Sequence, residues 1–302
     1  MGILIVGSVA LDSIQTPSGQ VEEILGGTAT YASVAASYFT EVSIVGVVGD
    51  DFPQEHVAFL QRKGIDTSGL WRQAGRTFRW KGEYTGDLNT ARTIDTQLNV
   101  FADFNPRMTA AHLRSEFLFL GNIDPDLQRG VLEQMHRPRV VACDTMNYWI
   151  DSKLESLRRT LSLVDIVLIN DGEVRQLAGE QNLFSAARKI LSWGPRIIVV
   201  KRGEHGAAMI GPKMIFEVPA YPLENPVDPT GAGDSFAGGF MGYLAAKRAS
   251  DDAMLRQAVV FGSVMASFNV TEFGPRRLGT LTFPEIVGRF HEFRQLTEFN
   301  DV

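Results

Sequence analysis

The chain has 302 residues, of which 44% are hydrophobic and 21% are charged, and this ordinary composition excludes an intrinsically disordered protein. The formal net charge of −6 argues against a nucleic-acid-binding protein, because such proteins need clustered Lys and Arg to displace counterions from phosphates. No segment reaches the roughly 18 consecutive apolar residues that a membrane-spanning helix needs.

Cellular location follows from the same features. No Lys or Arg precedes Arg62, which argues against a mitochondrial transit peptide, and the apolar run Ile3–Val6 is too short for a secretory signal. The single cysteine, Cys143, allows no intrachain disulfide, and we expect it in the core rather than as a nucleophile. We therefore expect a cytoplasmic protein with no nucleic-acid or membrane partner.

The N-terminal part of the chain predicts buried strands and a close-packed helix. The continuous apolar runs Ile3–Val6 and 42–48 predict strands that are buried on both faces. Between them, residues 26–37 predict a glycine turn followed by a helix of small residues, which can approach another element closely. A further helix is predicted over 56–63.

Residues 71–104 have a different character. Aromatic and charged side chains are mixed in the first half of this stretch, and Thr-rich alternation follows through Thr90, Thr93 and Thr96. This pattern predicts antiparallel strands that are exposed on one face. We interpret the stretch as a small second domain or lid, to which residues 12–25 are a further candidate contribution.

The rest of the chain alternates strand and helix signals. Strands are predicted over 117–120, 140–143, 166–169 and 197–200, and helices over 127–135, 154–161, 173–178 and 183–191. Strands that alternate with helices indicate βαβ units, a parallel sheet and right-handed crossovers.

One glycine-rich segment points to chemistry. Asp228-Pro-Thr-Gly-Ala-Gly-Asp234 precedes a helical pattern over 235–247. The first N–H groups of a helix have no intrahelical partner, and with the helix dipole they can bind an anion. Asp234 beside such a site suggests phosphoryl transfer, in which its carboxylate accepts the proton of an attacking hydroxyl. The alternative is that Asp234 only caps the helix.

Residues 228–240 resemble the C-terminal signature of the ribokinase-like (PfkB) carbohydrate kinases, with Pro229 where the family usually has Thr. Four other segments are similar to family motifs in the correct order: Gly26-Gly27 with its helix, Asn170-Asp-Gly-Glu173, Gly203-Glu-His-Gly206, and residues 258–274. The resemblance spans nearly the whole chain. It implies one α/β domain over 1–302, a three-layer sandwich with a mostly parallel central sheet and a small antiparallel β lid.

The resemblance also implies roles for the acceptor and transfer sites. Asp234 corresponds to the catalytic base, and the backbone that forms the anion hole comes from Gly231, Ala232 and Gly233. Asp12 matches the acid that grips acceptor hydroxyls, for which a carboxylate is suited because it accepts two hydrogen bonds. Gly26 and Gly27 would let the backbone approach the acceptor. The alternative for Asp12 is that it only caps a turn, and the alternative for the two glycines is that they only form a tight turn.

On the nucleotide side, the resemblance implies ATP as phosphate donor and Mg²⁺ as helper. Asn170 and Glu173 would hold water around Mg²⁺ and the phosphates, whereas the alternative is that Glu173 simply begins a helix. Two interpretations of Lys201 are open: it reaches the phosphates, or it is a solvated residue at a strand end. The turn at Gly203 and Gly206 would border the nucleotide. Asp228 and Thr230 match positions near a monovalent-cation site, so K⁺ is a further candidate cofactor.

The acceptor is less defined. Many sugar kinases have Asn at the position of Tyr31, so ribose and fructose are in doubt, and Tyr31 is either a pocket residue or part of the core. Weaker acceptor-site candidates are Arg76, Trp80 and Tyr84 in the lid, and Asp144 and Asn147 beyond a strand end. The sequence thus predicts an ATP-dependent kinase that phosphorylates a hydroxyl of a small sugar or polyol.

Three alternatives remain. The same machinery would serve a nucleoside or cyclitol kinase, and a non-catalytic descendant would only bind ligand or partner. The exposed edge of the lid could also join two copies in a homodimer.

Overall fold

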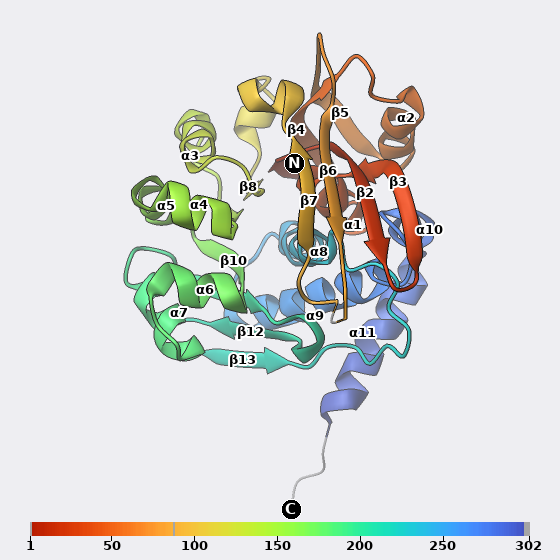
Figure 1. The fold of residues 1–302 in the computed structure, drawn as a ribbon. Coiled ribbons are helices and arrows are strands. Elements are labelled where there is room, and N and C mark those ends of the chain that lie inside the picture. Colours follow the sequence, from red (N-terminus) through yellow and green to blue (C-terminus); the bar gives the residue numbers. More distant parts are fainter. Residues whose placement is uncertain (1, 87, 299–302) are drawn as a thin grey trace, which may run out of the picture.

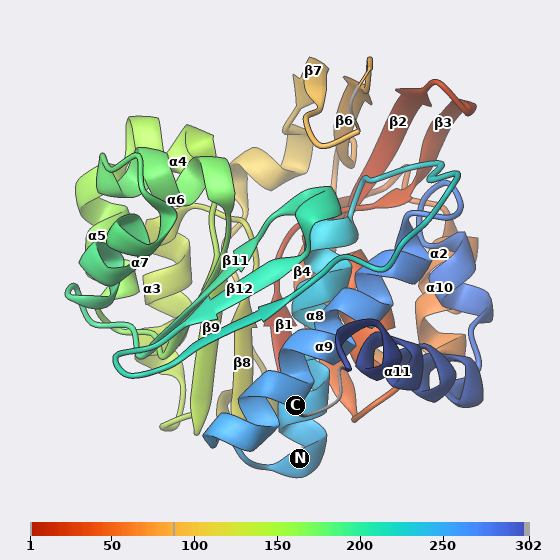
Figure 2. The same ribbon diagram turned by 90° about the horizontal axis from the view of Figure 1, so that it is seen from below.

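The computed structural model describes residues 2–86 and 88–298. Its largest element is a nine-stranded sheet in the order β13-β12-β11-β10-β9-β8-β1-β4-β5 (Figures 1 and 2). Seven strands are parallel: β1 (Ile3–Val6), β4 (Val42–Gly49), β5 (Ile65–Gln73), β8 (Phe117–Leu120), β9 (Val140–Asp144), β10 (Ile166–Asn170) and β11 (Ile197–Lys201). Two antiparallel strands complete the edge, β12 (Ala207–Ile210) and β13 (Ile215–Val218). The predicted mostly parallel sheet is confirmed.

Helices cover both faces of this sheet because successive strand residues point to opposite sides. In β1, Ile3 and Ile5 belong to one core cluster, whereas Leu4 and Val6 belong to the other. The first cluster includes residues of α1 (Thr28–Ala36), α2 (Gln54–Arg62), α8 (Ala232–Lys247), α9 (Asp252–Asn269), α10 (Arg276–Thr280) and α11 (Phe283–Thr297). The second includes residues of α3 (Pro125–Gln134), α4 (Asn147–Ser152), α5 (Leu154–Leu161), α6 (Asp171–Ala178) and α7 (Leu183–Leu191). The result is the expected three-layer sandwich.

Helices α1 and α8 pack against each other at backbone distance. A Cβ added to Gly238 would lie 2.1 Å from Ala32 O, and one added to Gly242 would lie 2.8 Å from Ala36 Cα. Because the contacting positions increase together along both helices, the two helices run parallel. Their N-terminal ends, capped by Gly27 and Gly231, therefore lie at the same end of the molecule.

A second sheet stands beyond the carboxyl end of β1, since β2 begins at Ala10 soon after β1 ends (Figure 2). Its order is β3 (Gly19–Gly26), β2 (Ala10–Thr16), β6 (Phe78–Glu83), β7 (Arg92–Gln97). The outer pairings are antiparallel, as expected, whereas the central pairing of β2 with β6 is parallel. We call these four strands the small sheet.

The stretch 71–104 is not all in the small sheet. Residues 71–73 belong to β5 of the large sheet, and Asn99–Asp103 form a 3-10 helix. Two other short 3-10 helices are His112–Arg114 and Gly203–His205. Among the described helices, none is long and apolar enough to cross a bilayer.

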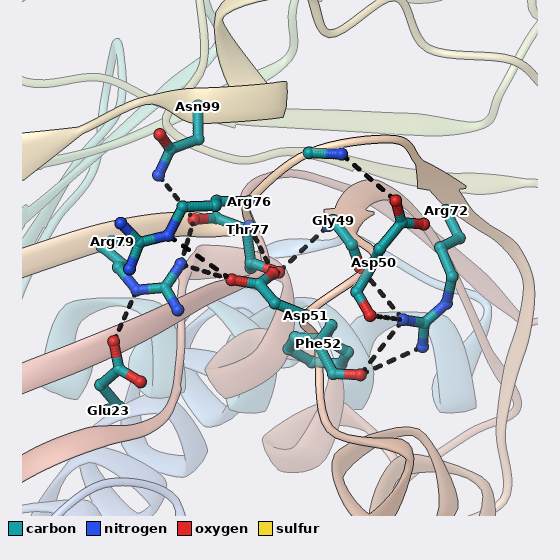
Figure 3. A network of polar contacts seen from close by, with 11 residues as sticks. Glu23, Gly49, Asp50, Asp51, Phe52, Arg72, Arg76, Thr77, Arg79 and Asn99 are labelled. Atoms are coloured by element: carbon teal, nitrogen blue, oxygen red, sulfur yellow. Dashed lines mark hydrogen bonds and ion pairs between the residues drawn. The ribbon is translucent and has the colours of Figure 1, made fainter.

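A polar network joins the root of the small sheet to the loop between β4 and α2 (Figure 3). Asp51 Oδ1 accepts hydrogen bonds from the backbone N–H and the hydroxyl of Thr77, both at 2.7 Å. The Arg79 guanidinium contacts Asp51 at 2.8 Å and Glu23 of β3 at 2.6 Å. Arg79 of β6 thus links β3 of the small sheet to the loop that follows β4 of the large sheet. The guanidinium of Arg76, which is more exposed, lies 4.0 Å from Asp51.

Candidate active site

The glycine turn before α8 has the geometry of an anion-binding helix start. Gly231 caps the helix in the left-handed region, with φ +74, and its carbonyl accepts from the Ser235 N–H at 2.8 Å. A Cβ there would lie 2.4 Å from the ring of Tyr31, so only glycine fits. The Ala232 N–H donates to Pro229 O at 3.1 Å. The N–H groups of Gly233 and Asp234 are therefore the first-turn donors best placed for a bound anion.

Asp234 lies in the first turn of α8 and is half-buried. Burial raises the pKa of its carboxyl to about 7, and the negative charge of Asp144 adds to this rise. The Lys201 ammonium and a hydrogen bond from the Thr28 side chain act in the opposite direction. A carboxyl with a pKa near neutral pH can exchange a proton with a substrate hydroxyl.

Asp12 lies in β2 and is 4% exposed. Burial, with the nearby carboxylates of Asp228 and Asp234, raises its pKa to about 8, whereas a hydrogen bond from the Gly27 N–H lowers it. A Cβ at Gly26 would lie 1.9 Å from Asp12 Oδ2, so glycine is required there. Gly27 has φ +90 and begins α1. The structure thus brings these residues together beside the start of α8.

Tyr31 is 1% exposed, and its ring packs against Gly231. Its buried hydroxyl has no hydrogen-bond partner among the described residues. Burial raises the pKa of this phenol, and the charges of Asp12, Asp228 and Asp234 raise it further. Tyr31 therefore belongs to the core and also borders the cluster of carboxylates.

A buried ion pair lies on the other side of Asp234. Lys201 Nζ, at the end of β11, lies 2.8 Å from Asp144 Oδ2, at the end of β9. Burial lowers the pKa of Lys201, but the carboxylates of Asp144 and Glu173 outweigh it and raise the pKa above its usual value. A Cβ at Gly233 would lie 3.0 Å from Lys201 Nζ, so this cation borders the first turn of α8.

Asp144 was also a weak candidate for acceptor binding. Its carboxylate is instead engaged by Lys201. Asn147 begins α4, and its side-chain oxygen accepts the Tyr148 N–H at 2.9 Å. Among the described residues, no hydrogen bond or ion pair joins the Asn147 side chain to the other candidate residues.

Asn170 and Glu173 form a capping box at the start of α6. Asn170 Oδ1 accepts the Glu173 N–H at 2.8 Å, and Glu173 Oε2 accepts the Asn170 N–H at 3.1 Å. Burial and the charge of Asp144 raise the pKa of Glu173 to about 7, which Lys201 opposes. Glu173 therefore begins a helix, as the alternative interpretation has it, and it also faces the Asp144–Lys201 pair.

Gly203 and Gly206 flank the short 3-10 helix that links β11 to β12. A Cβ at Gly203 would lie 2.1 Å from Asn89 Oδ1, in the connection between β6 and β7, and one at Gly206 would lie 2.1 Å from Val218 O. Both glycines thus allow close packing of neighbouring segments.

Asp228 is fully buried and organises the chain around the glycine turn. Its two oxygens accept the N–H groups of Thr230 and Gly274, both at 2.9 Å. Burial raises the pKa of this carboxyl, and the two hydrogen bonds lower it. The Thr230 carbonyl accepts from Asn269 Nδ2 at 2.8 Å, and Asn269 Oδ1 is buried without a hydrogen-bond partner among the described residues.

Of the lid candidates, only Tyr84 reaches this turn, where its hydroxyl lies 3.1 Å from Thr230 Oγ1. Trp80 packs on Gly82 and donates to Thr93 Oγ1 at 3.2 Å, and Arg76 lies in the network of Figure 3. Sequence reasoning missed Thr28 and Asn269. A signal for Thr28 was its place directly after the glycine pair, whereas nothing local distinguished Asn269.

Comparison with known proteins agrees with this arrangement. Residues 3–280 match the model of the pfkB family carbohydrate kinases. The chain belongs to this family. The predicted family, and with it an enzyme that transfers a phosphoryl group, is therefore confirmed.

One similar relative is the cytidine kinase of Thermococcus kodakarensis, 29% identical over 80% of this chain and 88% of that protein. Two solved structures have a TM-score of 0.78. The Methanocaldococcus jannaschii nucleoside kinase is 19% identical and covers 97% of this chain and 99% of its own. A putative ribokinase II from E. coli in complex with ATP and Mg²⁺ is 20% identical, with 96% and 99% covered. These structures confirm the ribokinase-like fold.

Proposed function

We propose that this kinase transfers the γ-phosphoryl group of ATP to a hydroxyl of a small sugar or polyol, with Asp234 as general base. The observation that carries the proposal is the position of Asp234. It lies in the first turn of α8, where its carboxylate interacts with the charges of both Asp12 and Lys201. One side of Asp234 suits a polyol, and the other suits phosphates.

In the reaction, Asp12 accepts hydrogen bonds from acceptor hydroxyls and Asp234 takes the proton of the attacking one. The acceptor oxygen forms a bond to the γ-phosphorus while the bond from that phosphorus to the bridging oxygen of ADP breaks. The N–H groups at the start of α8 stabilise charge on the moving phosphoryl group. The raised pKa of Asp234 matches its task, because a base near neutral pH both ionises and binds the proton.

The residues present fit a nucleotide phosphate chain. Gly231 and Gly233 leave the backbone open where side chains would meet Tyr31 and Lys201. Lys201 supplies a fixed positive charge, and Asn170 and Glu173 lie at the start of a helix beside it. Mg²⁺ that arrives with ATP would neutralise phosphate charge, and Glu173 would hold it through water.

A monovalent cation such as K⁺ is part of the proposal. Asp228 and Thr230 are its candidate ligands, and the buried Asn269 Oδ1 is a nearby oxygen without a hydrogen-bond partner among the described residues. Oxygen ligands of this kind suit a hard cation.

A nucleoside is the second candidate acceptor. Two observations favour it: the similarity to a cytidine kinase and the presence of Tyr31 at a position where many sugar kinases have Asn. Cyclitols share the vicinal hydroxyls that Asp12 would bind, and they remain an alternative.

The test measures ADP release from ATP and Mg²⁺ with pentoses, hexoses, inositols, sugar acids and nucleosides. We expect acceptor-dependent turnover, and a loss of about 100- to 10,000-fold in Asp234→Asn. Below a pH of about 7, kcat/KM should fall as Asp234 becomes protonated.

The matched control is Asp252→Asn, which removes an exposed acid from the first turn of α9. If both variants kept full activity, Asp234 would only complement the helix dipole. No turnover with any acceptor, together with ATP binding, would favour the non-catalytic descendant.

A homodimer through the small sheet is also proposed. All six residues of the edge strand β7 are exposed, and an exposed edge offers backbone groups for pairing. Light scattering after size exclusion would show a single-chain mass if this pairing does not occur.

A further inference from the structure

Tyr84 links the small sheet directly to the turn before α8. It follows β6, its N–H donates to Gln15 O in β2 at 2.9 Å, and its side chain is 8% exposed. Its hydroxyl lies 3.1 Å from Thr230 Oγ1. A side chain carried by the small sheet therefore contacts the residue that precedes Gly231.

Thr230 is held at each of its polar groups. Its N–H donates to Asp228 Oδ1 at 2.9 Å, and its carbonyl accepts from Asn269 Nδ2 at 2.8 Å. These two partners lie outside the small sheet, whereas the Thr230 hydroxyl interacts both with Asp228 and, at the small sheet, with Tyr84. Because Thr230 is bonded to Gly231, its position sets the direction of the first turn of α8.

A second contact brings the small sheet to the same cluster. A Cβ at Gly274 would lie 2.6 Å from Ile24 Cδ1 of β3, and the Gly274 N–H donates to Asp228 Oδ2 at 2.9 Å. The contact at Ile24 is apolar, so it limits only how closely β3 approaches the segment at Gly274. The hydrogen bond between Tyr84 and Thr230 has a direction, so it can orient the turn.

We propose that Tyr84 is a positioning residue for phosphoryl transfer. Through Thr230, it makes the ordering of the anion-binding turn depend on the position of the small sheet. The turn is then fully ordered only when the small sheet covers the acceptor, which disfavours transfer to water. The inference rests on the proposed function, and it replaces the earlier alternative that Tyr84 contacts the acceptor.

The first experiment needs no turnover. Hydrogen exchange of peptides over residues 229–236 is compared between the parent, Tyr84→Phe and Tyr221→Phe. The control removes the same phenol hydroxyl, which in Tyr221 donates to Glu292 Oε2 at 2.6 Å, away from the turn. We expect faster exchange in these residues only for Tyr84→Phe. Equal exchange in all three proteins would overturn the proposal.

The second experiment separates positioning from acceptor binding. Tyr84→Phe should lower kcat about tenfold and leave the KM for ATP unchanged, with more ADP released without acceptor per turnover. An effect of Tyr84→Phe confined to the KM for acceptor would contradict a positioning role.

A parent chain without turnover on any acceptor would instead contradict the proposed function. The exchange experiment would then still decide whether Tyr84 orders the turn.

Discussion

Lys201 Nζ and Asp144 Oδ2 lie 2.8 Å apart, and the two strands that carry them, β11 and β9, flank β10. Both side chains are largely buried, with exposed fractions of 17% and 6%. Removing one partner of such a pair leaves the other charge poorly solvated. The same lysine borders Gly233 in the candidate phosphate site. The pair therefore contributes to the fold and holds a cation beside the candidate phosphate site.

Lys201→Met should lower the free energy of unfolding by about 3–5 kcal/mol, because Asp144 stays buried without its partner. The double variant Lys201→Met/Asp144→Leu should recover most of that loss, since no charge is left. The KM for ATP should rise in the single variant and should be equally raised in the double variant, because both lack the Lys201 charge. Chemical denaturation and ATP titration check these expectations, and a double variant with normal ATP affinity would show that Lys201 acts only in the fold.

Gly231→Ala should abolish most activity, because the added Cβ would lie 2.4 Å from the ring of Tyr31. Gly64→Ala is the matched control, since Gly64 has the same φ of +74 and no atom within 4 Å of the added Cβ. The control should pay only the left-handed backbone cost of about 1–2 kcal/mol. Thermal melts and turnover measurements compare the two variants. Equal losses of activity and of melting temperature in both would show that only backbone strain matters at Gly231.

The two roles of Glu173 can be separated by its amide and alanine variants. Gln at the third helical position still supports a capping box, so Glu173→Gln should keep the melting temperature and lower turnover at limiting Mg²⁺. Glu173→Ala should lower turnover at limiting Mg²⁺ and should also lose about 1 kcal/mol of stability, because it cannot form the capping box. If Glu173→Gln turns over normally at every Mg²⁺ concentration, the residue is structural.

Asp12 should make the protein less stable as pH rises. Its pKa is raised from 3.8 to about 8, so the folded state binds a proton that the unfolded chain releases between these values. Stability from this group is thus complete below pH 3.8 and falls as pH rises toward 8. Asp12→Asn should raise the melting temperature at pH 8 by a few degrees and have no such effect near pH 4. An equal shift at both pH values would exclude this cause.

Much of the fold can be predicted from the sequence because its strands are buried on both faces. Ile3–Val6 alternates between two cores that are both apolar, and this produces a continuous apolar run. β5 is fully buried at only two of its nine positions, so it leaves no such run, and the prediction wrongly places its end at residues 71–73 in the small sheet. The parallel pairing of β2 with β6 joins distant segments and has no local signal.

The candidate site divides in the same way. The glycines around Asp234 mark the start of α8, because a tight turn and a helix N-terminus have local residue requirements. The contact between Tyr84 and Thr230 joins residues 146 positions apart. The pairing of Asp144 with Lys201 likewise depends on strand order, which places β9 and β11 on either side of β10.

The contact between α1 and α8 lies outside the candidate active site. Residues at this contact nevertheless determine how the two helix N-termini are aligned with each other. Gly238 and Ala32 meet without intervening side chains, so any larger residue there must tilt one helix against the other. Such a tilt would move the N-terminal ends of both helices at once, Gly27 with one and Gly231 with the other. A substitution where α1 and α8 meet would therefore disturb both parts of the candidate site together, although it lies outside both.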